Sequence, residues 1–295
     1  MTIRSDFPHQ VVEAPDMGIV LSDGCRLSAR VWMPEDAASN PVPAILEYIP
    51  YRKRDGTLPR DEMMHPYFAG HGYAAVRVDM RGCGDSEGLI DDEYTEQELR
   101  DAEEVIAWLA AQPWCSGAVG MMGKSWGGFN CLQAAYNQPP ALKAVISVCS
   151  TTDRFMDDIH FKGGCLLGEN FGWGAVMLSY SSRPADPVLR PDWRADWLAR
   201  LEAALQAAER LRLAIEGHAW EAEIAGLRVT ASVGIATWPP HGPGWSATSR
   251  KRFSCMARSP RTTRWTRWRC ASPVLIASAT VSSMWLTAPA PRSAK

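Results

Sequence analysis

The last 72 residues of this 295-residue sequence contain no aspartate or glutamate, although the whole chain has 33 acidic residues. Residues 1–223 hold those 33 acidic side chains and 20 basic ones, a net charge of −13, and residues 224–295 hold 11 basic ones, a net charge of +11. A folded domain seldom lacks one sign of charge over such a length. Two interpretations follow: a basic tail with a partner of its own, or foreign sequence such as translation in a shifted reading frame.

Other absences narrow the class of protein. The eight cysteines form no CxxC pair and no cluster with histidine, so we expect reduced, mostly buried thiols and neither a metal, a cofactor nor a disulfide scaffold. The N-terminal segment lacks the apolar run of a signal peptide, and the uncharged residues 271–291 contain three prolines, which argues against a membrane helix. With 46% hydrophobic and 22% charged residues, the composition predicts a globular protein, which we expect in the cytoplasm without a membrane partner.

The first half of the chain alternates strand-like and helix-like patterns. This alternation predicts a mostly parallel sheet with helices on both faces, and apolar runs such as AVGMM and AVISV are typical of strands buried on both sides. The expected strands cover residues 25–33, 44–49, 73–79, 118–122 and 144–149. Apolar residues at helical spacing predict helices over residues 96–111 and 126–137.

After residue 150 the pattern loosens into an aromatic, glycine-rich stretch that fits a cap inserted over a site. Further along, residues 196–220 predict an amphipathic helix and residues 227–238 a strand. We therefore divide the chain into four parts: an α/β core (1–150), a partial cap (151–203), a helix–strand fragment (204–238) and a basic, irregular tail (239–295).

One short motif indicates a catalytic residue. The segment GKSWGG (123–128) matches GxSxG, and an expected strand runs into it while an expected helix runs out, which is the context of a nucleophile elbow. The glycines are needed because the turn brings neighbouring groups too close for larger side chains. Ser125 is therefore the predicted nucleophile, and the N–H of Trp126 at the helix N-terminus is predicted to face a developing oxyanion.

Four segments in this order resemble the CocE/NonD family of α/β-hydrolases, the cocaine-esterase and X-prolyl dipeptidyl-peptidase group. They are EYIPYRKRDG (47–56), GYAAVRVDMRGCGDSEG (72–88), GKSWGGF (123–129) and VCSTTDRFMDDIHFKGGCLLGENFGWG (148–174). The resemblance covers residues of about 15 to 203. It implies an α/β-hydrolase fold and a serine hydrolase that cleaves a small ester, amide or peptide through an acyl-enzyme. It also implies that Tyr51 binds the oxyanion beside the Trp126 amide, whereas the residues alone favour a tyrosine packed at a strand end.

The acid and the base of the expected catalytic triad are missing from their family positions. In α/β-hydrolases they follow the nucleophile in the order serine, acid, histidine, but the family's Gly-Trp-x-Asp and Gly-Pro-Trp-x-His segments do not occur here. The base candidates are His160 in the cap and His241 in the late part of the chain, and Glu216 is the acid candidate. Asp85 and Glu87, in the segment RGCGDSEG, are interpreted as loop structure.

The late part of the chain leaves alternatives open. Residues 207–238 resemble the last helix and strand of a diguanylate cyclase (GGDEF) domain without its signature, so no cyclase activity is implied, and an ordinary helix and strand of the cap is the other interpretation. In residues 250–269 the arginines can contact phosphates and the tryptophans can stack on bases, so this stretch can bind nucleic acid. We favour a serine hydrolase over a catalytically silent remnant and over a nucleic-acid-binding protein.

Overall fold

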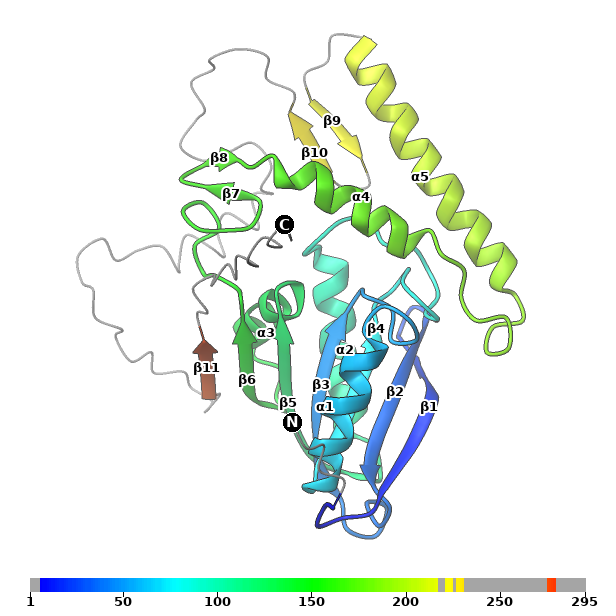
Figure 1. Ribbon diagram of the computed structural model, residues 1–295, viewed down its shortest axis with the longest axis vertical. Helices are drawn as coiled ribbons and strands as arrows, with labels where there is room; N and C mark the ends of the chain where they lie inside the picture. Colours follow the sequence, from blue (N-terminus) through cyan, green and yellow to red (C-terminus); the bar gives the residue numbers. More distant parts are fainter. Residues whose placement is uncertain (1–5, 217–220, 225–226, 231–274, 280–295) are drawn as a thin grey trace, which may run out of the picture.

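The computed structural model describes residues 6–216, 221–224, 227–230 and 275–279 (Figure 1). His241 and the basic stretch 250–269 lie outside the described residues. The predictions made for them, including nucleic-acid binding and an irregular tail, therefore stay predictions.

A seven-stranded sheet forms the centre of the protein, in the order β1-β2-β4-β3-β5-β6-β11 (Figure 1). The strand β11 joins parallel to β6, and β4, β3, β5 and β6 are parallel to one another, whereas β1 and β2 are antiparallel additions at the other edge. The prediction of a mostly parallel sheet is confirmed. The strands are β1 (Val11–Val20), β2 (Arg26–Pro34), β3 (Val42–Ile49), β4 (Ala74–Asp79), β5 (Cys115–Lys124), β6 (Leu142–Val148) and β11 (Leu275–Ala279).

Helices cover both faces of this sheet, as predicted. The helix α1 (Leu58–Gly70) packs on one face, and α2 (Glu96–Ala110) and α3 (Trp126–Asn137) pack together on the other (Figure 1). Apolar side chains at helical spacing along α2 are excluded from water against the strands, which is the main source of stability for such a layer. The fully buried members of this core include Leu46, Val76, Val105, Ile106 and Leu109.

The cap follows β6. It contains the short hairpin β7 (Phe161–Lys162) and β8 (Cys165–Leu166) and the helix α4 (Glu169–Ser181), which lies beyond the carboxyl ends of the parallel strands (Figure 1). A site at that end of the sheet is therefore covered by α4, as expected for a cap.

A long helix, α5 (Trp193–Glu216), leads into the hairpin of β9 (Glu221–Ile224) and β10 (Leu227–Thr230). Arg200 ties α5 to the loop after β4, donating to the carbonyl of Ser86 at 2.6 Å and to that of Gly84 at 3.2 Å. The helix runs without a break through residues 203 and 204, where the sequence analysis divides the cap from the helix–strand fragment. The helix itself therefore gives no sign of this boundary, and the division stays a prediction.

The six described cysteines are free thiols, and three of them (Cys83, Cys115 and Cys131) are buried. Cys25 is partly buried, and Cys149 in the core and Cys165 in the cap are exposed, so the expectation of mostly buried thiols holds for only three of the six described cysteines. In the described ranges, no helix combines the length and the apolar character needed to cross a bilayer. The cytoplasmic location stays a prediction.

Candidate active site

Ser125 lies in the turn between β5 and α3, as the motif predicts. Its backbone has φ 57° and ψ −120°, a conformation that is rare for a residue with a side chain and that persists only where the surroundings enforce it. The Ser125 N–H donates to the carbonyl of Val148 at 2.9 Å, and the Phe129 N–H donates to the carbonyl of Ser125 at 3.0 Å. These bonds fix the turn between the sheet and the helix, and the Ser125 side chain is half-buried.

The glycines of the motif leave no room for side chains. A Cβ atom would lie 2.4 Å from the backbone of Gly127 if built on Gly123, and 2.7 Å from Ile49 Cγ2 if built on Gly127. On Gly128 it would lie 2.6 Å from the carbonyl oxygen of Val148. The close approach of α3 to the strands, which produces the strained turn at Ser125, therefore depends on glycine at these positions.

Tyr51, just after β3, reaches the nucleophile turn. Burial raises the pKa of Tyr51, the nearby Glu93 carboxylate raises it further, and hydrogen bonds with the Ser125 side chain and the Trp126 backbone act in the opposite direction. The phenol therefore keeps its proton at neutral pH and can donate a hydrogen bond. Three residues singled out from the sequence, Tyr51, Ser125 and Trp126, are thus brought together.

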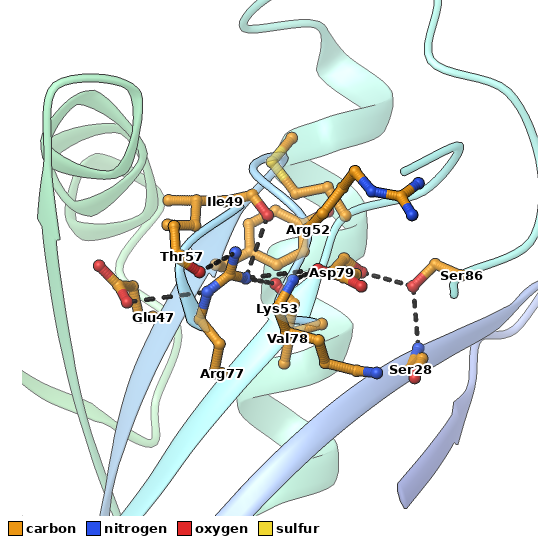
Figure 2. Close-up of polar contacts among 12 residues, drawn as sticks. Ser28, Glu47, Ile49, Arg52, Lys53, Thr57, Arg77, Val78, Asp79 and Ser86 are labelled. Atoms are coloured by element: carbon orange, nitrogen blue, oxygen red, sulfur yellow. Dashed lines mark hydrogen bonds and ion pairs between the residues drawn. The ribbon is translucent and has the colours of Figure 1, made fainter. Parts of the chain in front are cut away.

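Buried charges hold the loop that carries Tyr51 (Figure 2). The Asp79 carboxylate accepts the Lys53 N–H at 2.7 Å, in a region where Asp79 is fully buried. The Lys53 ammonium lies 2.7 Å from Asp85 Oδ2, and the two side chains are 2% and 1% exposed. Asp85 is therefore a partner of this loop, which agrees with its interpretation as loop structure.

Glu98, at the start of α2, supports Trp126 and was not singled out from the sequence. Its Oε1 accepts a hydrogen bond from Trp126 Nε1 at 2.7 Å, and its Oε2 accepts one from the Tyr94 N–H at 2.7 Å. Burial raises the pKa of Glu98 to about 8 despite these donors. Because acidic residues are common in the first turn of a helix, the sequence alone offered no sign of this contact.

His160 lies in the cap with both ring nitrogens facing oxygen atoms. Nε2 is 2.7 Å from Glu93 Oε2, and Nδ1 contacts Asn170 Oδ1. The Asn170 amide nitrogen donates to the carbonyls of His160 and Leu167, which fixes its oxygen toward the ring. Burial lowers the pKa of His160, but Glu93 and Asn170 raise it above its ordinary value overall. Because both nitrogens face acceptor oxygens, the arrangement favours the charged ring over a neutral ring with a lone pair available to accept a proton.

Aromatic side chains of α4 cover Tyr51. The ring centroids of Trp173 and Tyr180 lie 6.0 and 6.1 Å from that of Tyr51. Trp173 Nε1 also donates to Glu93, the carboxylate that pairs with His160. The cap is thus fastened to the core directly beside the candidate nucleophile.

The remaining candidates are not brought to the site by the described residues. Glu216 is the last residue of α5, and His241 lies outside the described ranges. The strand β11 lies parallel beside β6. Among the described residues, one group of donor atoms within 4.8 Å of one another could hold a metal ion; it comprises Glu47, Asp61 and His65.

Comparison with known proteins gives consistent results. Residues 23–227 match the model of the X-Pro dipeptidyl-peptidase (S15 family). The chain is 33% identical over 178 residues, 55% of its length, to a Mycobacterium bovis protein named as a candidate serine esterase, and 34% identical over 170 residues, 56% of its length, to a cocaine esterase from a Rhodococcus species. A solved CocE/NonD family hydrolase from Staphylococcus aureus superposes with a TM-score of 0.51 and 21% identity, covering 61% of this chain and 35% of that one.

These matches confirm the predicted α/β-hydrolase fold and the resemblance to CocE/NonD hydrolases. The chain spans 28% of the length of each of the two curated relatives. The resemblance of residues 207–238 to a GGDEF domain stays a prediction, and the family match extends into that segment as far as residue 227. Because the match covers more than half of the sequence, the chain belongs to the X-Pro dipeptidyl-peptidase (S15) family.

Proposed function

We propose that this chain is a serine hydrolase that cleaves an ester or amide bond through an acyl-enzyme on Ser125. In this mechanism Ser125 Oγ attacks the carbonyl carbon, the bond to the alcohol or amine breaks, and water then hydrolyses the acyl group from the serine. The observation that carries the proposal is the strained turn at Ser125 together with the position of Tyr51 beside it, with the Tyr51 and Trp126 ring centroids 6.5 Å apart.

Tyr51 and Trp126 supply the oxyanion donors in this proposal. The raised pKa of Tyr51 keeps a proton on the phenol, and the Trp126 N–H belongs to the first turn of α3, where the helix favours negative charge. Donors that are already in place when charge develops need little reorganisation, which is why such groups contribute strongly to rate. The buried pair of Lys53 and Asp85 supports this role by holding the loop of Tyr51.

The substrate class follows from the relatives and from the cap. One relative is named a cocaine esterase, and the family description names an X-Pro dipeptidyl-peptidase. Trp173 and Tyr180 add apolar aromatic surface beside Tyr51, which suits a small ester, amide or peptide with an apolar group next to the scissile bond.

The proton acceptor for Ser125 is the weakest part of the machinery. His160 is a poor base because Glu93 and Asn170 engage both of its nitrogens. Glu216 and His241 are the remaining candidates, and they satisfy the order serine, acid, histidine. The contacts of both His160 nitrogens with Glu93 and Asn170 also favour a second candidate function, a catalytically silent hydrolase that retains only the nucleophile and the oxyanion donors.

Hydrolysis of a p-nitrophenyl ester by the full chain separates the two candidates. An active hydrolase loses turnover in Ser125→Ala and retains it in Ser179→Ala, a control at an exposed serine of the cap. Mass spectrometry should locate the acyl group, or a fluorophosphonate label, on Ser125. A silent hydrolase shows no more than the roughly 10³- to 10⁴-fold acceleration over water that remains when triad groups are removed.

A further inference from the structure

A group of buried charged side chains lies on the face of the sheet that α1 covers. Asp61 and His65 are four residues apart on one face of α1, and Glu47 lies on β3. The side chains of Asp61 and His65 are 0% exposed and that of Glu47 is 2% exposed. His65 Nε2 lies 3.6 Å from Glu47 Oε2 and 3.8 Å from Asp61 Oδ1, so one nitrogen and two oxygens surround a common point.

His65 has no hydrogen-bond partner in this group. Neither of its ring nitrogens is paired within the part of the chain that the structure describes, although the ring is buried and stacks on Trp32 with centroids 4.8 Å apart. Leaving a buried polar atom unpaired costs about 1–3 kcal/mol, and the distances to the two carboxylates are too long for hydrogen bonds. The arrangement therefore suits an occupant that contacts Nε2 and both carboxylates at once.

The spacing of the three atoms distinguishes a metal ion from a water molecule. A water that bonds two groups at about 2.8 Å with tetrahedral geometry holds them about 4.6 Å apart. A tetrahedral metal ion at about 2.0–2.1 Å from each ligand holds the ligand atoms about 3.4 Å apart. The observed distances of 3.6 and 3.8 Å are close to the spacing of metal ligands.

Two guanidinium groups face the same carboxylates. Arg77 Nε lies 3.8 Å from Glu47 Oε2 (Figure 2). It also lies 3.4 Å from Asp61 Oδ2, and Arg60 Nη2 lies 2.5 Å from Glu47 Oε2 and 2.7 Å from Asp61 Oδ1. Arg77 is fully buried, whereas the Arg60 side chain is 35% exposed and can turn into solvent.

We propose that Glu47, Asp61 and His65 bind one divalent transition-metal ion, and that Arg60 occupies the two carboxylates when no ion is bound. One imidazole nitrogen and two carboxylate oxygens are ligands that Zn²⁺ and Co²⁺ accept, whereas Ca²⁺ and Mg²⁺ prefer oxygen alone. The ion would join α1 to the sheet. Asp61 also accepts a hydrogen bond from Thr57 Oγ1 at 2.6 Å, which extends the connection toward the loop of Tyr51.

Titration of the chelator-treated full chain with Co²⁺ tests this site without any enzyme assay. One ion should bind per chain and give weak visible absorption without a thiolate charge-transfer band, which separates this site from cobalt held by cysteine. Loss of a second-shell group typically weakens metal affinity about 10- to 100-fold, so removal of a ligand in Asp61→Asn or His65→Gln should weaken binding at least about 100-fold. His71→Gln, at an exposed histidine near the end of α1, is the matched control and should bind as the wild type does.

The variant Arg60→Ala distinguishes a metal site from a cluster of ion pairs that binds no metal. Because the arginine competes with the ion for both carboxylates, its removal should tighten Co²⁺ binding at least about fivefold, the upper value for ion pairs exposed on both sides, since here the carboxylates are buried. Near-UV circular dichroism checks that each variant folds. If Asp61→Asn and His65→Gln do not fold, cobalt binding by the wild type and by Arg60→Ala still tests the proposal. The proposal is overturned if the wild type binds no cobalt with this spectrum, if folded His65→Gln binds like the wild type, or if Arg60→Ala binds more weakly.

Discussion

Replacing Lys53 with methionine should destabilise the protein by about 3 kcal/mol. The Lys53 ammonium lies 2.7 Å from Asp85 Oδ2 and both side chains are almost fully buried, so the variant leaves a buried carboxylate without its nearest cation. Removing one partner of a buried pair costs about 3–5 kcal/mol. Asp85 keeps two other partners, Arg54 Nε at 3.2 Å and the Asp186 N–H at 2.9 Å, and we therefore expect the lower end of that range.

Urea denaturation followed by tryptophan fluorescence at pH 7 measures this loss. The matched variant Lys53→Met/Asp85→Leu removes both charges, so it should be less destabilised than the sum of the two single variants, with a coupling of about 1.5–3 kcal/mol. Coupling below about 0.5 kcal/mol would show that the two charges do not stabilise each other, and the argument for a buried pair behind Tyr51 would be wrong.

The same pair predicts a dependence of stability on pH. Burial alone would raise the pKa of Asp85, but Lys53, the Asp186 N–H and Arg54 lower it from 3.8 to about 2. Because the folded-state pKa lies below the unfolded one, the contribution is fully present above pH 4 or so and is lost as the pH falls toward 2. A difference of roughly two pKa units corresponds to about 2.5 kcal/mol, and this part of the acid-induced loss should shrink in Lys53→Met.

Three further results are expected. Tyr51→Phe should lower kcat on a p-nitrophenyl ester about 10²- to 10³-fold with little change in KM, and unchanged steady-state kinetics would remove Tyr51 from the oxyanion site. Gly127→Ala should lower the free energy of unfolding by about 1–3 kcal/mol because its Cβ meets Ile49, and an unchanged melting temperature would contradict the close packing at the elbow. His160, whose pKa is raised, should contribute stability that is present at low pH and lost as the pH rises above its ordinary value near 6.5, and thermal melts of His160→Gln should lack this loss.

The sequence pattern predicts the strands and helices whose apolar residues recur at a regular period, and it does not predict β1 and α1, where that period is interrupted. The five predicted strands and the helices α2 and α3 are present because their apolar residues follow the period of their structure. The strand β1 was not predicted because Pro15 and a register shift between Ala14 and Met17 interrupt the alternation of apolar and polar residues. The helix α1 carries Pro66 in its interior and polar side chains in its buried face, including Asp61 and His65.

The candidate site divides in a similar way. Ser125 and Trp126 were predictable because the elbow is a local motif whose glycines and flanking elements lie within a few residues. The contact of Glu93 with His160 joins residues 67 positions apart through the cap, and no local pattern encodes it. The same holds for Glu98, whose contact with Trp126 Nε1 depends on how α2 packs beside α3.

The order of the triad residues along the chain limits which side chains can be the acid and the base. In an α/β-hydrolase the acid follows the strand beside β6, which here is β11, but no acidic residue occurs after Glu223. A triad acid that follows Ser125 and lies beyond the cap must therefore be Glu209, Glu216, Glu221 or Glu223, which lie before β11 in the chain. A base at His241 would then have to meet Ser125 from a position that the fold does not normally use. The described part of the chain thus brings together the proposed nucleophile, Ser125, and the two proposed oxyanion donors, Tyr51 and Trp126, and slow acylation of Ser125 by an activated ester is the activity we expect of this arrangement without a conventional base.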